Sequence, residues 1–261
     1  MPNRLNILNI WVDQVSRKDA LEVVEGFLHN GNRPHMVFAV NPEKNFSVPR
    51  DPLLYESFKN ADLLIPDGIG IVAAVRLLYG FKLKRIPGSE FIFDICRICQ
   101  EKGLGVFVYG AKEDVNQKAV KVLEERFTGL SIVGRSNGYI KEDEMPALID
   151  KINASNARVL FLALGSPIQE RWLSKFSNQL ESIRVCQGVG GTLDTIASRV
   201  RRAPEAWCRM NLEWLYRLLN EPKRIRRQRV LPIFALKVVV EAITKKLSRN
   251  VSGSFNNLIN Q

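Results

Sequence analysis

Asp67 interrupts an apolar run in the stretch DLLIPDGIGIV, which covers residues 62–72. A carboxylate at the end of a buried strand is costly unless it is hydrogen-bonded or takes part in chemistry. One interpretation is that Asp67 caps a helix starting at Gly68, because aspartate is a preferred capping residue. The other is that it acts as a general base at a ligand site. This stretch alone leaves both interpretations open.

Four other polar or glycine-rich turns end strand-like runs: NPEK (41–44), YGAKED (109–114), LGSPIQE (164–170) and GVGGTLD (188–194). Asn41 and Gln169 each offer a donor and an acceptor, which suits sugar hydroxyls or a nucleobase edge, or else a helix cap. A glycine turn that enters a helix presents backbone N–H groups to phosphate, although such glycines also serve tight turns alone. The candidate binding residues of the two glycine turns are Gly110, Gly190, Gly191 and Asp194.

Arginines supply the remaining candidates. Arg85 in LKRIPGSE precedes a Pro-Gly turn, and taken alone it resembles a solvated surface arginine. Arg217, Arg224 and Arg227 recur at intervals of seven and three residues, which is compatible with one face of helical structure across Pro222. The guanidinium fork binds phosphate through two parallel hydrogen bonds and keeps its charge when partly desolvated. These arginines therefore predict a phosphate-bearing ligand.

Strand-like and helix-like runs alternate along the first 198 residues. Strands are expected at 35–41, 62–67, 105–110, 130–136, 157–165 and 182–190, and the helices between them include 51–61, 88–103, 113–127 and 167–181. Continuous apolar strands separated by helices predict an α/β, Rossmann-like fold, with a mostly parallel sheet and helices on both faces. Because parallel strands all end at one edge, we expect the five polar turns to form one ligand-binding rim.

The net charge of +11 is concentrated toward the C-terminus. Residues 199–261 hold 14 Lys and Arg against 4 Asp and Glu, whereas residues 1–198 hold 24 against 23. We therefore expect a nearly neutral domain at 1–198 and a basic, helical appendage at 199–261. Such asymmetry indicates a polyanionic partner, which is nucleic acid, an anionic lipid surface or a phosphate-bearing substrate.

The stretch IFALKVVVEAITKKL after Pro232 is amphipathic and has basic ends. It is long enough to lie on an anionic membrane surface and too polar to cross a membrane. The alternative is an ordinary helix packed on the body of the protein. An exposed apolar tail also drives self-association, which would give a homo-oligomer away from the membrane.

Several sequence signatures are missing. The chain has two histidines and no H-E-x-x-H motif or carboxylate cluster with metal spacing, so no metal and no cofactor is expected. Neither glycine turn fits G-x-G-x-x-G, which disfavours an NAD-type enzyme. Cys96 and Cys99 lie in a helix-like run, where core-facing positions are expected rather than a redox or metal role. With no signal sequence or membrane-spanning run, a cytoplasmic location is expected.

Taken together, nine ordered motifs resemble those of the WecG/TagA/CpsF family of bacterial glycosyltransferases. The motifs are VNPEK, ADLLIPDGIGIV, RIPGSE, YGAKEDV, VGRSNGYI, LALGSPIQERW, GVGGTLD, RVRRAPEAW and LEWLYRLLNEPKRIRR, and the resemblance runs from about residue 6 to residue 240. Nine motifs in order are far more specific than any one of them.

The resemblance implies an inverting, metal-independent enzyme at the inner face of bacterial membranes. Such enzymes transfer a sugar from a UDP-sugar to a polyprenyl-diphosphate-linked acceptor. The sugar is typically N-acetylmannosamine, added to lipid-linked N-acetylglucosamine in wall teichoic acid synthesis, and relatives transfer the corresponding uronic acid or other hexoses in surface polysaccharide assembly. We therefore expect a peripheral protein bound to the anionic inner face of the cell membrane, with no nucleic-acid partner.

The resemblance also implies roles for residues already singled out. It makes Asp67 the general base and places Arg85 and Gln169 in the same pocket. It further implies that the three arginines of the C-terminal appendage reach the donor diphosphate and close the site at the membrane.

Two alternatives remain open. The first keeps the fold but uses a different UDP-hexose as donor, because many family members have Thr where this chain has Ala39, a position regarded as part of the pocket. The second is a non-enzymatic membrane or nucleic-acid adaptor that uses the basic tail, which would leave the polar rim without a role. Protection from thermal unfolding by UDP favours the enzyme, and protection by DNA and not by UDP favours the adaptor.

Overall fold

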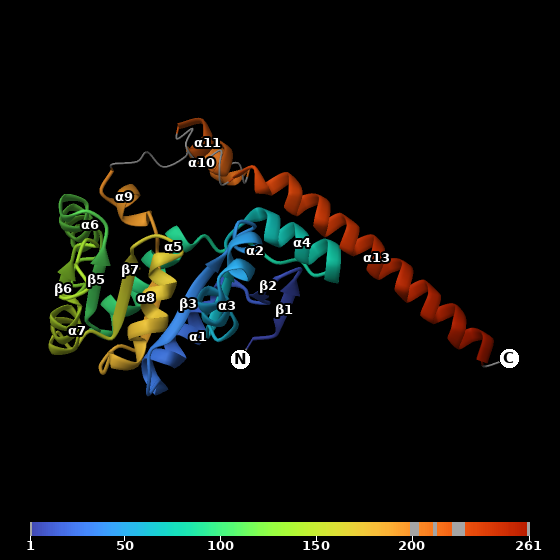
Figure 1. Ribbon diagram of the computed structural model, residues 1–261. Helices are drawn as coiled ribbons and strands as arrows, with labels where there is room; N and C mark the ends of the chain where they lie inside the picture. The colour runs from blue at the N-terminus through green and yellow to red at the C-terminus, as the bar shows by residue number, and fades with distance from the viewer. Residues whose placement is uncertain (1, 199–203, 211–212, 221–227, 260–261) are drawn as a thin grey trace.

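The computed structural model describes residues 2–198, 204–210, 213–220 and 228–259 (Figure 1). Its centre is a sheet of six parallel strands: β3 (His35–Val40), β4 (Leu63–Pro66), β5 (Val106–Gly110), β6 (Ile132–Ser136), β7 (Val159–Ala163) and β8 (Val185–Gly188). The strands lie in the order β4-β3-β8-β7-β5-β6. The predicted α/β fold is confirmed, and each strand lies within its predicted range.

Helices cover both faces of this sheet. They are α1 (Arg17–Asn30), α2 (Lys44–Ser47), α3 (Pro52–Lys59), α4 (Ile69–Tyr79), α5 (Gly88–Lys102), α6 (Glu113–Arg126), α7 (Met145–Ala154), α8 (Ile168–Phe176) and α9 (Thr192–Ile196). Apolar residues of α3, α4, α7 and α8 pack on one face, and those of α1, α5, α6 and α9 pack on the other. Cys96 and Cys99 are buried in the second of these clusters, at the core-facing positions that the sequence predicted, and both are free cysteines.

The central strands are buried because helices cover both faces. Every residue of β5 and β7 is buried, and both strands are nearly unbroken apolar runs, as expected of parallel strands. Strand β6 lies at an edge of the sheet and is partly exposed. Side chains inside the central strands therefore belong to the core, and the polar residues that follow the strands are the ones available to a ligand.

A short antiparallel hairpin, which the sequence analysis did not predict, precedes the sheet. Its strands are β1 (Arg4–Ile7) and β2 (Ile10–Asp13). The buried carboxylate of Asp13 accepts hydrogen bonds from the Arg4 guanidinium at 2.7 Å and from the backbone N–H of Leu64 in β4 at 2.8 Å. The first bond joins the two strands of the hairpin, and the second holds the hairpin against β4.

The C-terminal part of the chain is helical, as predicted. It contains α10 (Glu205–Arg209), α11 (Glu213–Asn220) and α13 (Val230–Ile259). The beginning of α13 packs against α4 and buries Phe234 and Val238, and the rest of the helix extends away from the body (Figure 1). No helix in the described ranges is both long enough and apolar enough to cross a membrane. The domain boundary after residue 198 stays a prediction.

Candidate active site

A cavity of about 890 Å³ opens at the carboxyl edge of the sheet. Turns that follow β3, β4, β7 and β8 form much of its lining, and α11 and α13 supply further residues. Seven of the predicted site residues line it: Asn41, Asp67, Arg85, Gln169, Gly190, Gly191 and Asp194. The volume is typical of pockets that hold small-molecule ligands. The fold thus brings together polar residues that are far apart in the sequence.

Asp67 stands directly after β4, where the backbone still bonds to the neighbouring strand. Its N–H and that of Gly68 both donate to the carbonyl of Val40, at 3.0 and 3.2 Å. Helix α4 then begins at Ile69, with Gly68 at its N-cap position and no side-chain cap. Asp67 is therefore not the N-cap residue of α4, and its half-buried side chain lines the cavity instead.

The loop before α5 lies beside Asp67. It is tied to the end of β4 by a hydrogen bond from the N–H of Ile86 to the last carbonyl of that strand, at 2.8 Å. A Cβ on Gly88, at the start of α5, would lie 4.0 Å from the Asp67 carboxylate and 3.1 Å from the Cβ of Ala39. Arg85 comes from the same loop and also lines the cavity. Asp67 and Arg85 are therefore presented by two adjacent, hydrogen-bonded segments.

Gln169, in the first turn of α8, reaches across the end of β8. Its Oε1 accepts a hydrogen bond from the N–H of Gly190 at 3.0 Å, which leaves the amide Nε2 as the donor end. A Cβ on Gly188 would lie 2.4 Å from Nε2 of Gln169, so a side chain at this position would displace the amide where it crosses the strand end. Gln169 is buried and does not cap its own helix, which has no side-chain cap.

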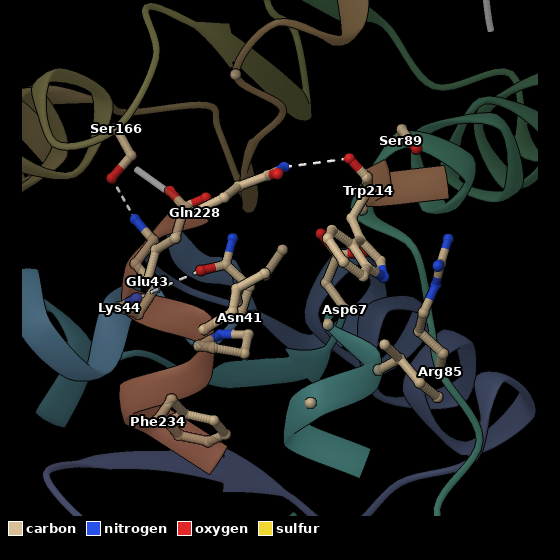
Figure 2. Close-up of a pocket in the computed structure, with 18 of the residues that line it drawn as sticks. Asn41, Glu43, Lys44, Asp67, Arg85, Ser89, Ser166, Trp214, Gln228 and Phe234 are labelled. Carbon is tan, nitrogen blue, oxygen red and sulfur yellow. Dashed lines mark hydrogen bonds between the residues drawn. The ribbon is translucent and has the colours of Figure 1, made fainter. Parts of the chain in front are cut away.

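Asn41 follows β3 and shapes the turn there. Its Oδ1 accepts a hydrogen bond from the N–H of Lys44 at 3.3 Å, a local turn bond of the kind that the capping interpretation expects, and the residue also lines the cavity (Figure 2). Pro42 in the same turn packs closely against Gly68 and Gly70, where added Cβ atoms would each lie 2.7 Å from the proline ring. The turns after β3 and β4 therefore form one packed wall of the cavity.

An ion pair between the turns after β3 and β7 was missed by the sequence analysis. The Nζ of Lys44 lies 2.8 Å from Oε1 of Glu170. It also donates to the hydroxyl of Ser166 (Figure 2). Lys44 and Glu170 both line the cavity, and their side chains are 8% and 2% exposed. No local signal indicates this pair, because its members lie 126 positions apart and each resembles a solvated charge in its own motif.

Residues of α11 and α13 cover part of the cavity. Trp214 of α11 and Phe234 of α13 line it, together with Gln228, which lies just before α13 (Figure 2). The Gln228 side-chain amide donates to the carbonyl of Trp214 at 3.2 Å and so connects the two helices. A bound ligand would therefore meet aromatic side chains from the basic appendage, none of which the sequence analysis singled out.

Four predicted site residues are not among the described residues that line the cavity. Gly110 ends β5 with a φ of 126°, and a Cβ there would lie 2.5 Å from the backbone of Ala163, so close packing against β7 requires glycine. Gly110 does not line the cavity, and its role in binding stays a prediction. Arg224 and Arg227 lie outside the described residues, as does the side chain of Arg217 on α11.

The described lining of the cavity carries more acidic than basic groups. Its cationic side chains are Lys44 and Arg85, and its anionic side chains are Glu43, Asp67, Glu170 and Asp194. Within the described part of the chain, no group of three or more His, Cys, Asp or Glu is placed to hold a metal ion. The charged side chains of this described lining therefore have a negative formal balance.

The similarity to known proteins covers both the sheet domain and much of the C-terminal appendage. The family model described as the glycosyl transferase WecG/TagA/CpsF family matches residues 5–248. The chain is similar to the N-acetylglucosaminyldiphosphoundecaprenol N-acetyl-beta-D-mannosaminyltransferase of Bacillus subtilis, with 32% identity over 211 residues that are 81% of this chain and 81% of that protein. The protein of the same name from Bacillus spizizenii is 34% identical over 208 residues, 80% of each chain.

Proposed function

The chain belongs to the WecG/TagA/CpsF family of glycosyl transferases, and we propose that it transfers N-acetylmannosamine, or its uronic acid, from a UDP-sugar to a polyprenyl-diphosphate-linked sugar. The family and the class of enzyme are those predicted from the nine motifs. The names of the two Bacillus relatives support N-acetylmannosamine as the sugar and diphosphoundecaprenol-linked N-acetylglucosamine as the acceptor. The observation that carries the proposal is that Asp67, Arg85 and Gln169 line the same cavity.

In the proposed reaction, Asp67 is the general base. It takes the proton from the acceptor hydroxyl while the hydroxyl oxygen attacks the anomeric carbon from the face opposite UDP. The bond between that carbon and the diphosphate oxygen breaks, UDP leaves, and the configuration at the carbon inverts. The hydrogen-bonded strand end that carries Asp67 supports this role, because a catalytic group must be held in a fixed position.

The leaving diphosphate gains negative charge, which the enzyme must offset. Lys44 is already paired, and the described lining is acidic in balance. We infer that Arg217, Arg224 and Arg227 supply the missing charge in place of a metal ion, as the family resemblance implies. The segment that carries Arg224 and Arg227 directly precedes Gln228, which lines the cavity, and this position in the chain supports the assignment.

The exposed side of α13 supports docking on a membrane. Leu236, Val240, Ile243 and Leu247, which we call the outer stripe, recur every three or four residues, and each is more than half exposed. An apolar stripe of this kind needs a partner. Beside the basic charge of the appendage, the outer stripe suits the anionic inner face of a membrane, where a polyprenyl acceptor is presented. We therefore infer a peripheral protein of the cytoplasmic face, whose outer stripe self-associates away from the membrane.

A panel of UDP-sugars tests this proposal. Each is offered with a soluble lipid-diphosphate-N-acetylglucosamine analogue, and UDP release is measured with and without EDTA. We expect the fastest release with UDP-N-acetylmannosamine and the same rate in EDTA. Faster release with another UDP-hexose would show that this hexose is the donor sugar. That outcome is the alternative raised by Ala39, which stands where many family members have Thr.

Two other outcomes would contradict larger parts of the proposal. Activity that is lost in EDTA and restored by Mg²⁺ would show that a metal ion neutralises the diphosphate. No release with any donor, combined with thermal protection by DNA and not by UDP, would favour the adaptor.

A further inference from the structure

Glu170 has one oxygen that finds no hydrogen-bond partner among the residues that the structure describes. The residue is 1% exposed, and its Oε1 is paired with Lys44 Nζ at 2.8 Å. Its Oε2 is buried and accepts no hydrogen bond from the residues that the structure describes. A carboxylate can accept about four hydrogen bonds, and a buried acceptor without a donor lowers stability. Because Glu170 lines the cavity, such an acceptor could receive its missing hydrogen bond from a bound ligand.

The surroundings hold this carboxylate in place. Lys44 contacts Oε1 and the hydroxyl of Ser166, and its ammonium lies 5.0 Å from the ring centre of Phe58. The Nε2 of Gln169 lies 3.5 Å from the same Oε1, and Gln169 is fixed in turn by its bond to Gly190. Because these contacts fix Oε1, the direction of Oε2 is set before any ligand binds.

Glu170 also lies at the right place for ligand binding. It lines the cavity, whereas Gln187 does not, although its Oε1 is another buried acceptor with no partner in the described part of the chain. Glu170 follows β7, which is three strands along the sheet from β4, the strand that ends beside Asp67. At the usual spacing of strands, these two strand ends are roughly 14 Å apart. A ligand with its reacting atom near Asp67 would therefore meet Glu170 through a remote group.

We propose that Glu170 binds the sugar nucleotide directly, with its Oε2 accepting a hydrogen bond from a hydroxyl or N–H group of that ligand. The inference rests on the proposed function, which supplies the class of ligand. Three parts of the ligand carry such groups: the uracil base, through its N3–H, the ribose, through its hydroxyls, and the transferred sugar, through its hydroxyl and acetamido groups. Because the contact is remote from Asp67, it contributes to affinity more than to turnover.

Calorimetry with the variant Glu170→Gln tests the contact. Dissociation constants are measured for UDP and for UDP-N-acetylmannosamine, because the glutamine keeps the shape of the side chain and loses its charge. We expect affinity to weaken about ten-fold or more. Weakened binding of UDP itself would show that the hydrogen-bond donor lies on the nucleoside. Weakened binding of the UDP-sugar alone would show that this hydrogen-bond donor lies on the transferred sugar. In turnover assays, KM should rise by the same factor while kcat changes little.

Two further variants separate ligand binding from a structural role. Lys44→Met combined with Glu170→Gln removes both charges of the pair, so it should recover thermal stability that Glu170→Gln loses, while ligand affinity stays low. Asp62→Asn is the matched control, because Asp62 is a buried, ion-paired carboxylate at the opposite edge of the sheet. This variant should lower the melting temperature and leave the affinity for UDP and for the UDP-sugar unchanged.

The outcomes distinguish this inference from the proposed function. Equal dissociation constants in the wild-type protein and in Glu170→Gln, for both probes, would overturn the inference and leave the proposed function standing. Recovery of affinity in the double variant would do the same, because Glu170 would then act through Lys44 alone. A wild-type protein that binds neither probe would refute the proposed function and the inference with it.

Discussion

Two buried carboxylates at opposite edges of the same sheet have different environments. Asp62, just before β4, accepts hydrogen bonds from Arg33 at 2.5 Å and from the N–H of Met36 at 2.9 Å. Glu170, at the carboxyl edge, has one oxygen paired with Lys44 and the other without a partner among the described residues. The protein completes the hydrogen bonding of the first carboxylate by itself and leaves that of the second incomplete beside a cavity.

The environment of Asp62 is that of a structural carboxylate. Burial by itself would raise the pKa of Asp62, but hydrogen bonds from Arg33 and the Met36 N–H, together with the contact to His35, hold this pKa below its usual value. A lowered pKa means that the folded protein stabilises the charged carboxylate, so Asp62 contributes to stability at neutral pH. Satisfied groups of this kind are the rule in protein cores, and an unsatisfied one needs an explanation, which the proposed ligand contact would supply for Glu170.

The largest expected effect concerns the three arginines that we propose add positive charge at the carboxyl edge of the sheet. Replacing Arg217, Arg224 and Arg227 together by Ala should abolish transfer even to a soluble acceptor analogue, because the described cavity lining is acidic in balance. The measurement is UDP release by purified protein whose folding is checked by circular dichroism. The control variant removes two exposed cations from α6, Lys118 and Lys121, and should keep full activity. Full activity of the triple variant would show that these arginines are only surface charge.

Asp62 and Asp67 lie at the two ends of the same strand, β4. Comparing variants of the two residues therefore distinguishes an effect on catalysis from an effect on stability. Asp67→Asn should keep the fold and the affinity for UDP while lowering kcat by roughly 10²-fold or more, the scale of a lost general base. Asp62→Asn should do the reverse, with a lower melting temperature and an unchanged kcat. Steady-state kinetics and thermal unfolding of both variants measure the contrast. A near-normal kcat in Asp67→Asn would remove this residue from the role of base.

A smaller effect is expected from the outer stripe of α13. Replacing Leu236, Val240 and Ile243 by Ser should weaken binding to anionic vesicles by about ten-fold or more, because these exposed side chains could no longer enter the membrane interface. Transfer to a soluble acceptor should persist, because Phe234 and Val238, on the buried side of the helix, are unchanged. Vesicle sedimentation at two salt concentrations should also show weaker binding at the higher one. Unchanged vesicle binding by the variant would assign docking to the body.

Local sequence patterns predict most of the fold and only some of the site. The sequence points to Asp67 and Gln169 as cavity residues because each follows an apolar run that ends a strand. Ligands of parallel sheets bind beside the carboxyl ends of the strands. The N-terminal hairpin is missed because its four-residue strands are too short for a clear pattern and depend on the contact of Asp13 with β4. Lys44 and Glu170 are missed as a pair because only the strand order, with β8 between β3 and β7, brings their turns together.

The smallest effect on function should come from Asp62, and its pH dependence sharpens the contrast between the two edges. Because its pKa is lower in the folded protein than in the unfolded chain, its stabilisation is present above the unfolded value near 4 and is lost as the pH falls through the lowered folded value. Asp62→Asn should lower the free energy of unfolding by about 1–3 kcal/mol at pH 7.

Urea unfolding of both proteins at pH 7, 5 and 3.5 measures this difference, which should shrink below about pH 4 as the wild-type carboxylate takes up its proton. The affinity for UDP at pH 7 should be the same in both proteins. A stability difference that stayed constant into acid would mean that the charge of Asp62 is not what stabilises the fold. A loss of UDP affinity in Asp62→Asn would mean that the two edges of the sheet are coupled, and the carboxylate at the amino edge would then belong to the binding machinery as well.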